Sequence, residues 1–315
     1  MNETRRALLA ALADGSVPGP TLAERLGVSR AAVWKQVDAL REEGFEIESG
    51  DDGYRLVGVP EYGAAALEFG LDAPYAVEYH DRVASTNDCA RELAEEGASD
   101  IVVVADEQTG GRGRLARRWT APKGGIWASL LVRPRRPPAE IPLYTLAAAV
   151  AVARASHEVG VDARIKWPND VLVVDASGRE RKLAGILTEM EGEADRVSWL
   201  VVGTGVNANV DADDLPPGAT SLRAEVGDVD RRAFLQRMLE TFHELTSDGA
   251  NLDRILDAWR EHAATLGRRV RVETPGGVIE GDAVDVQFPG SLVVRTDDGE
   301  ERVVHAGDCE HLRPA

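Results

Sequence analysis

The run TLAERLGVSRAAVWKQVDALREEG, residues 21–44, constrains the fold of this chain more than any other segment. It predicts two helices that meet near Gly27, because glycine is common just past the end of a helix. Thr21 and Glu24 have the spacing of a capping box for the first helix. Ser29 is a candidate N-cap for the second, since its hydroxyl can accept from a free backbone N–H.

The second of these helices is amphipathic. Its apolar residues Val33, Val37 and Leu40 form one stripe, which indicates a helix that packs on a small core. ETRRALLAALAD predicts a helix ahead of the pair, and FEIES, GDDG and YRL predict a strand, a turn and a returning strand behind it. Helix, helix, turn, helix and hairpin is the order of a winged helix-turn-helix, here over residues 1–58.

In such a unit the second helix of the pair enters the major groove of DNA. Residues 1–58 contain seven basic and ten acidic side chains, and Asp38, Glu42 and Glu43 lie on that same helix. This is a weak electrostatic footprint for DNA, so contacts to base edges would have to contribute more than usual. The candidate DNA contacts are Ser29, Arg30 and Lys35.

The rest of the chain predicts one larger α+β domain and one small β domain. Between residues 59 and 265, runs such as DIVVVADEQ, IWASLLV and SWLVVGTGVNAN read as strands, and LYTLAAAVAVARASHEVG reads as a long helix. No βαβ unit repeats, which favours antiparallel hairpins. From 266 to 315, short strands and turns predict a small SH3-like β-barrel. The expected fold class is therefore α+β in three domains.

Composition favours a cytoplasmic protein without a membrane partner. The chain has no run of 18 apolar residues, its start MNETRRALLA lacks a signal-peptide pattern, and two lone cysteines form no disulfide framework. The net charge is −18, and only four of the 36 basic residues are lysines. Such a surface is typical of a halophilic cytoplasm, where charges are screened over roughly 3 Å at about 1 M salt.

One basic segment contrasts with this acidic background. QTGGRGRLARRW, residues 108–119, holds four arginines within seven residues. Its glycines let backbone N–H groups approach a ligand, and Arg112 and Arg114 can each offer forked donors to phosphate or carboxylate oxygens. It is not a Walker A loop, since no Gly-Lys-Ser/Thr follows. Taken alone, the segment also fits a solvated loop or a nucleic-acid patch.

Four further segments point to a ligand site. STN, residues 85–87, opens a helix, where hydroxyls and free N–H groups suit an anion, although a plain N-cap looks the same. KWPND, residues 166–170, places a lysine, a tryptophan and a carboxylate around a proline corner. RKLAGIL and GTGVN contain mid-strand glycines, which mark either a bulge or the close approach of a ligand.

In this order, STN, ADEQTGGRGR, KWPND, RKLAGIL and GTGVN resemble the signature of the biotin protein ligase family. With the winged helix-turn-helix in front, essentially the whole chain is similar to the bifunctional form, biotin ligase and biotin operon repressor. The resemblance implies a biotin/lipoate ligase-like catalytic domain that uses ATP to form biotinyl-5'-AMP and transfers biotin to one lysine of a biotin carboxyl carrier domain. It also implies biotin-responsive repression at operator DNA and a homodimer when biotinyl-AMP is bound.

The resemblance also implies residue roles. Arg112 and Lys182 are the expected catalytic groups, because cations lower the barrier between a carboxylate and an α-phosphate. Asp170, with Lys166, is expected to orient the carrier lysine or assist the Mg²⁺ that enters with ATP, and no tightly held metal is expected. The expected contacts of biotin and biotinyl-AMP are Ser85, Thr86, Asn87, Gln108, Arg112, Gly113, Arg114, Trp119, Lys182, Gly185, Gly205 and Asn207.

Two of these positions have open readings. The family's basic segment usually continues Gly-Arg-Gly-Arg-x-Gly-Arg, and Ala116 replaces the third glycine. Alanine costs little there unless the position needs a positive φ. Trp119 fits an apolar cover over the ligand and an ordinary core tryptophan equally.

Two other functions compete with ligation of biotin. One is a biotin-sensing repressor without ligase activity, against which the phosphate-directed set Arg112, Arg114 and Lys182 argues. The other is a related acyl-ligase for lipoate or octanoate. The pair GRGR and KWPND favours biotin over these acyl groups.

Overall fold

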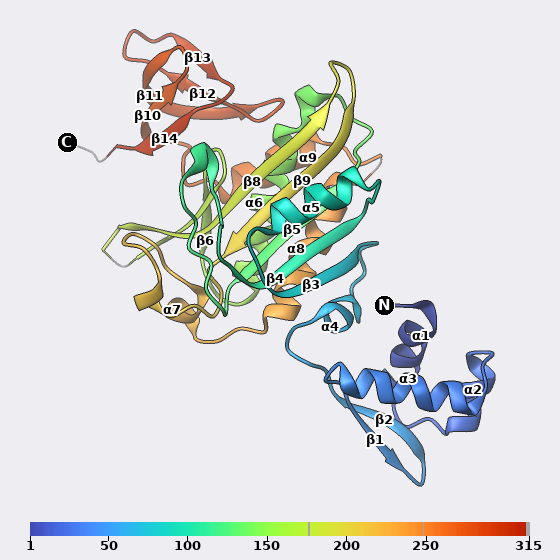
Figure 1. Cartoon of the computed structure of the whole chain (residues 1–315). Helices are drawn as coiled ribbons and strands as arrows, with labels where there is room; N and C mark the ends of the chain where they lie inside the picture. The colour runs from blue at the N-terminus through green and yellow to red at the C-terminus, as the bar shows by residue number, and fades with distance from the viewer. Residues whose placement is uncertain (176, 248, 313–315) are drawn as a thin grey trace. The chain divides into compact units, whose positions relative to one another are not determined.

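The computed structural model describes residues 1–175, 177–247 and 249–312. The chain divides into two compact units, Met1–Tyr79 and His80–Ala315, whose elements are labelled in Figure 1. Residues 313–315, the end of the predicted third domain, lie outside the described residues.

The first unit has the order of helices and hairpin that the sequence predicts. Ser29 caps the third helix, since its hydroxyl accepts a hydrogen bond from the Ala32 N–H at 3.1 Å. A two-residue turn, 51–52, joins the strands of the wing. The elements are α1 (Glu3–Ala13), α2 (Gly19–Arg25), α3 (Arg30–Glu42), β1 (Glu46–Gly50), β2 (Gly53–Gly58) and α4 (Ala64–Glu68).

The predicted capping box at Thr21 and Glu24 is wrong, because α2 begins two residues before Thr21. The helix starts at Gly19 after Pro18, and within the described chain no side chain caps it. Pro20 explains the earlier start: proline lacks an N–H and fits the first turn of a helix, where that donor has no partner.

The core of this unit confirms the predicted apolar stripe. Val33, Val37 and Leu40 of α3 are buried against α1 and the hairpin. Ala65 of α4 belongs to the same buried cluster. Helix α4 therefore packs into the first unit.

Seven strands of the described chain pair in the order β3-β4-β5-β9-β8-β7-β6. From β4 to β6 every neighbouring pair is antiparallel, which agrees with the absence of a repeated βαβ unit. The strands are β3 (Ala76–Val83), β4 (Ile101–Gln108), β5 (Ile126–Val132), β6 (Ala163–Lys166), β7 (Asp170–Val174), β8 (Glu180–Gly192) and β9 (Val197–Val206).

Helices cover both faces of this sheet (Figure 1). Helix α5 (Thr86–Glu95) packs on β4, β5 and β9, whereas α6 (Pro142–Glu158) lies on the opposite face beside α8 (Arg231–Thr246) and α9 (Asp253–His262). Because α6 is enclosed by the sheet and two helices, it is apolar nearly all round. The connections contain η1 (Arg114–Ala116), η2 (Pro138–Glu140), η3 (Ala212–Asp214) and α7 (Leu222–Val226).

The predicted C-terminal barrel is a small antiparallel sheet, whose described strands run in the order β13-β12-β11-β10-β14. Val270, Val272 and Val294 are among its buried residues. The Trp167 indole N–H donates to the Gly290 carbonyl at 2.9 Å, which joins this sheet to the KWPND corner. The strands are β10 (Arg269–Thr274), β11 (Gly277–Gln287), β12 (Ser291–Arg295), β13 (Glu301–Val304) and β14 (Asp308–His311).

Candidate active site

A cavity of about 250 Å³ lies between the first turn of α5, the arginine-rich segment and strands β7, β8 and β9. Most of the predicted site residues meet here, although they come from separate stretches of the sequence. Lys166 and Asn207 are not among the residues that line it. The predicted residues that line the cavity are Ser85, Thr86, Asn87, Gln108, Arg112, Gly113, Arg114, Trp119, Asp170, Lys182, Gly185 and Gly205.

Two glycines form the floor of the cavity. The ring of Trp119 lies so close to them that a side chain at either position would collide with it. Gly185 of β8 is paired with Gly205 of β9 across the sheet. A Cβ atom at Gly205 would lie 2.8 Å from Trp119 Nε1, and one at Gly185 would lie 3.1 Å from Trp119 Cζ3. Trp119 also packs edge-on against Trp127, with ring centroids 6.4 Å apart. Trp119 is thus both a wall of the cavity and part of the neighbouring apolar cluster.

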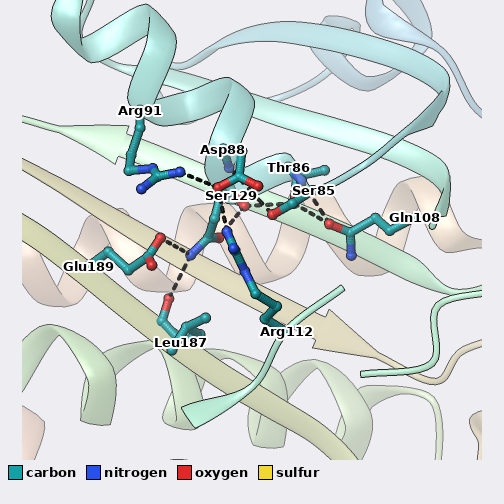
Figure 2. A network of polar contacts seen from close by, with 10 residues as sticks. Ser85, Thr86, Asp88, Arg91, Gln108, Arg112, Ser129, Leu187 and Glu189 are labelled. Atoms are coloured by element: carbon teal, nitrogen blue, oxygen red, sulfur yellow. Dashed lines mark hydrogen bonds and ion pairs between the residues drawn. The ribbon is translucent and has the colours of Figure 1, made fainter. Parts of the chain in front are cut away.

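Polar side chains cluster at the first turn of α5 (Figure 2). The Thr86 backbone N–H and hydroxyl both donate to Gln108 Oε1, at 2.7 and 3.1 Å. Ser129 Oγ lies 2.7 Å from Thr86 Oγ1 and 2.6 Å from Asn87 Oδ1, while Asn87 Nδ2 donates to Glu189 at 2.9 Å. Thr86, Asn87 and Ser129 are buried, Gln108 and Glu189 are half-buried, and their hydrogen bonds hold all five in fixed positions at the cavity.

Gly203 explains how Asn87 reaches the sheet. A Cβ atom at this position would lie 2.1 Å from Asn87 Oδ1, so any larger residue would displace the amide. The glycines of GTGVN therefore allow the close approach of side chains of the chain itself, Asn87 on Gly203 and Trp119 on Gly205, which differs from both readings of the sequence, a bulge or a ligand. The structure shows no register shift at Gly203 or Gly205 in the pairing of β8 with β9.

The arginine-rich segment is a short hairpin between β4 and β5. Gly113 N–H donates to the Arg117 carbonyl at 2.8 Å, and Trp119 N–H donates to the Gly111 carbonyl at 2.9 Å. Leu115 and Ala116 at its tip have φ values of 56° and 55°. Ala116, which replaces the usual third glycine of the family pattern, therefore occupies the left-handed region, where alanine is strained.

Arg112 and Arg114 have different kinds of partner. Arg112 Nη2 lies 2.5 Å from the Asp88 carboxylate, so its charge is paired. Arg114 donates to Asn169 Oδ1 at 3.0 Å and to the Gly307 carbonyl at 2.9 Å, both of them neutral acceptors. Burial lowers the pKa of the Arg114 guanidinium. The nearby carboxylates of Asp308 and Asp170 act in the opposite direction and raise this pKa. Within the described ranges no carboxylate forms an ion pair with Arg114.

Lys182 lies on the wall of the cavity. Its ammonium is 2.6 Å from the Asp170 carboxylate and 5.2 Å from the centroid of the Trp119 ring. Asp170 and Gly185 are paired across β7 and β8, which explains why a lysine three residues before Gly185 can reach this carboxylate.

Sequence reasoning missed several residues of this site. Asn169 holds Arg114 and also donates to the Ile186 carbonyl at 2.9 Å, and its place within KWPND was the available signal. The others depend on contacts between distant segments, which no local pattern reveals. They are Asp88, Ser129, Glu189 and Asp308.

The remaining predicted residues lie elsewhere. Asn207 follows β9, and its amide donates to the Thr220 carbonyl at 2.9 Å, so it holds a turn beside the cavity. Lys166 ends β6 directly opposite Asp170. In the first unit, Arg30 and Lys35 are exposed on α3.

Three segments of the chain match known families. Residues 4–55 match an HTH domain, residues 79–207 match the biotin/lipoate A/B protein ligase family, and residues 265–312 match the biotin protein ligase C terminal domain. The chain is 37% identical over 307 residues to the bifunctional ligase/repressor BirA of Bacillus subtilis, with 92% of each chain covered. The chain therefore belongs to the biotin protein ligase family.

Two further proteins are similar to this chain. The biotin–[acetyl-CoA-carboxylase] ligase of Mycobacterium tuberculosis is 34% identical over 247 residues, which cover 74% of this chain and 89% of that one. The structure of biotin protein ligase from Aquifex aeolicus in complex with biotin and ATP aligns with a TM-score of 0.61 at 26% identity, covering 75% of this chain and 99% of that one. These likenesses confirm the predicted fold class. Within the described ranges, every helix is too short or too polar to cross a bilayer.

Proposed function

We propose that this chain is an ATP-dependent biotin protein ligase and a biotin-responsive repressor. The observation that carries the ligase half is the meeting of Arg112, Arg114 and Lys182 at one glycine-floored cavity. Three cations suit a reaction in which two anions approach each other, whereas retention of a small acid alone would not need them. The Mycobacterium tuberculosis relative is named a biotin–[acetyl-CoA-carboxylase] ligase and the Bacillus subtilis relative a bifunctional ligase/repressor, and both names support this proposal.

In the first step, a carboxylate oxygen of biotin attacks the α-phosphorus of ATP, and pyrophosphate leaves. Lys182 and Arg112 neutralise the charge that the carboxylate and the α-phosphate bring together, and a well-aimed donor contributes on the order of a few kcal/mol. Lys182 acts electrostatically, since a protonated amine is not a nucleophile. Arg114 binds the phosphate of the product, biotinyl-AMP, and Gly113, which has no side chain, lets the hairpin backbone come close to that phosphate.

The other predicted contacts hold the biotin end. Ser85, Thr86, Asn87 and Gln108 supply donors and acceptors. Thr86 and Gln108 are fixed by hydrogen bonds to each other, and Asn87 and Ser85 by bonds to neighbouring residues. Gly185 and Gly205 form the floor, Trp119 covers it, and Asn207 supports it from the adjoining turn.

In the second step, the amine of a carrier lysine attacks the acyl carbon of biotinyl-AMP, an amide bond forms, and AMP leaves. Asp170 and Lys166 are paired across β6 and β7 at the KWPND turn, and we assign to them the orientation of the incoming amine. Until that amine arrives, the arginine hairpin excludes water from the mixed anhydride, which would otherwise hydrolyse.

Mg²⁺ enters the proposed reaction with ATP. Nucleotide-bound Mg²⁺ is held by substrate phosphates and one or two carboxylates, and Asp170 supplies such a carboxylate on the cavity wall. The ion would neutralise the pyrophosphate leaving group. The described residues contain no group of three or more His, Cys, Asp or Glu side chains placed to hold a metal by themselves.

The repressor half rests on the first unit. Arg30 and Lys35 project from α3, the helix that would enter the major groove, whereas Ser29 caps this helix and fixes where it begins. We assign direct contacts with operator DNA to the two basic residues. Occupancy of the cavity by biotinyl-AMP would promote the homodimer that binds two half-sites.

The proposed setting is a salty cytoplasm, for which the net charge of −18 is the support. The proposed functional domains are residues 1–58 for DNA, 59–265 for catalysis and 266–315 for the C-terminal sheet, although α4, which lies after residue 58, packs on the core of the DNA-binding unit. The carrier domain of a biotin-dependent carboxylase is the proposed protein substrate.

One assay tests the proposal against its alternatives. The protein is incubated in high salt with ATP, Mg²⁺, biotin and a biotin carboxyl carrier domain, and the carrier is probed for covalent biotin. The expected result is biotinylated carrier with release of pyrophosphate. Tight biotin binding without transfer would instead identify a sensor, and transfer of lipoate or octanoate would identify the related acyl-ligase.

A further inference from the structure

Asp88 is an anion placed beside a cavity that is built for anions. It lies in the first turn of α5, directly after the STN segment, and its carboxylate accepts from Arg112 on one side and from Arg91 on the other. Figure 2 shows Asp88 between the two guanidinium groups. Both arginines contact the same oxygen, Oδ1.

The two partners of Asp88 differ in their relation to the cavity. Arg112 lines it, whereas Asp88 and Arg91 do not. Arg91 lies one helical turn after Asp88, so this pair is local to α5 and independent of the hairpin. Arg112 comes from the hairpin, 24 residues further along the chain. Movement of Arg112 toward a ligand would therefore leave Asp88 with one cation still in contact.

Arg114 provides the contrast. Among the described residues, its side chain donates to the neutral oxygens of Asn169 and Gly307, so an anion can approach it without breaking an ion pair. A phosphate that binds the Nη2 donor of Arg112 has to displace a carboxylate from it. The side chains of Arg112 and Asp88 are 47% and 30% exposed, and a pair in this setting is weak enough to exchange.

We propose that Asp88 is a positioning residue that holds Arg112 as an internal counter-ion, which a phosphate-bearing ligand displaces while Arg91 keeps the Asp88 carboxylate paired. The inference rests on the proposed function, because the displacing ligand is biotinyl-AMP. Asp88 and the ligand phosphate compete for the guanidinium of Arg112. The ion pair with Asp88 has to break when the ligand binds, so a stronger pair lowers the affinity for the ligand. Arg91 competes with Arg112 for Asp88 and thereby favours release of Arg112.

The competition predicts effects of opposite sign. Asp88→Asn removes the competing charge and keeps the shape, so it should tighten biotinyl-AMP binding by about two- to fivefold, the range of a partly exposed ion pair. Arg91→Ala removes the rival cation and should weaken binding of the same ligand. Neither variant should change binding of biotinamide, which carries no anion. Both effects should vanish when Arg112 is replaced by alanine.

The experiment measures dissociation constants of biotinyl-AMP and biotinamide for the full chain by calorimetry, with unfolding temperatures for every variant. Glu95→Gln, an exposed carboxylate on the same helix, is the matched control for a change in helix charge. Asp88→Ser serves as a second variant, since serine is tolerated in a first helical turn. Weaker or unchanged biotinyl-AMP binding in both Asp88 variants, or an effect that persists without Arg112, would overturn the proposal. Failure of the wild type to bind either biotin compound would instead refute the proposed function.

Discussion

The Lys182 ammonium and the Asp170 carboxylate form an ion pair of 2.6 Å inside the candidate active site. The two residues come from adjacent strands, and the Trp119 ring lies beside the pair. The Asp170 carboxylate contacts the Lys182 ammonium in the way that the carboxylate of biotin would contact it in the proposed reaction. The pair therefore holds the ammonium in position before any ligand arrives.

Replacement of Lys182 by alanine should slow formation of biotinyl-AMP by about 100- to 1000-fold, the usual cost of removing one well-aimed donor to a developing charge. The fold should persist, since the side chain is partly exposed and leaves no buried void. Pyrophosphate release in a single turnover gives the rate. Lys123→Ala, at an exposed lysine, should leave that rate unchanged. A near-normal rate for Lys182→Ala would remove this residue from the reaction.

Replacement of Arg112 by alanine should speed the release of biotinyl-AMP by about tenfold or more, since a hydrogen bond from a charged donor contributes roughly 1.5–3 kcal/mol. Rapid dilution of the loaded enzyme, followed by detection of free biotinyl-AMP, measures this rate. Arg196→Ala, on the exposed turn between β8 and β9, is the control. An unchanged release rate would refute the assigned contact.

Replacement of Ala116 by glycine should stabilise the arginine hairpin. Alanine in the left-handed region costs about 1 kcal/mol, which glycine avoids, and part of this gain is offset by the greater freedom of glycine in the open hairpin. Hydrogen exchange at the Gly113 and Trp119 amides, which close the hairpin, should slow by up to about fivefold. Faster exchange at both amides would mean that the strain does not limit closure.

Replacement of Lys35 by alanine should weaken binding to mixed-sequence duplex DNA and lower the slope of log affinity against log salt by about one, as expected for one lost phosphate contact. Fluorescence anisotropy over a salt series measures both. Arg196→Ala again serves as the control, because it lies outside the DNA-binding unit. An unchanged slope with weaker operator binding would place Lys35 on a base edge instead.

Cys309 should make the stability of the second unit depend on alkaline pH. Burial raises the pKa of its thiol from the ordinary 9.0 to about 12. The unfolded chain loses this proton first, so the free energy of unfolding contributed by the buried thiol falls as the pH rises from 9.0 toward 12. The stability advantage of the wild type over Cys309→Ala should therefore be smaller at about pH 10.5 than at about pH 8. An advantage that is constant over this range would contradict the raised pKa.

The sequence predicted the helices, the strands and the residues of the candidate site better than it predicted which residues contact one another. Ser29 and Ser85 were found as N-caps because a cap is decided by a few neighbouring residues. Thr21 failed as a cap because Pro20, a neighbour with a stronger preference, moved the start of the helix. Local patterns of this kind are visible in a single sequence.

Contacts between distant segments were not visible. Gly185 meets Gly205, and Arg112 meets Asp88, only because the strand order and the path of the hairpin bring them together. The sequence indicated that Ala116 would be strained if its position needs a positive φ, but it did not show whether the position does. The φ value depends on the closure of the whole hairpin. Register and tertiary packing set these features, and neither follows from spacing along the chain.

The Gly307 carbonyl accepts from Arg114 although 193 positions separate the two residues. Protein synthesis proceeds from the N-terminus, and domains fold as they emerge. A nascent chain that has been translated only to residue 300 would already contain the hairpin and the glycine floor, but Arg114 would still lack this acceptor. The proposed phosphate-binding group thus reaches its final hydrogen bonding late in biosynthesis, which would delay retention of the activated acyl group until the ribosome has passed Gly307.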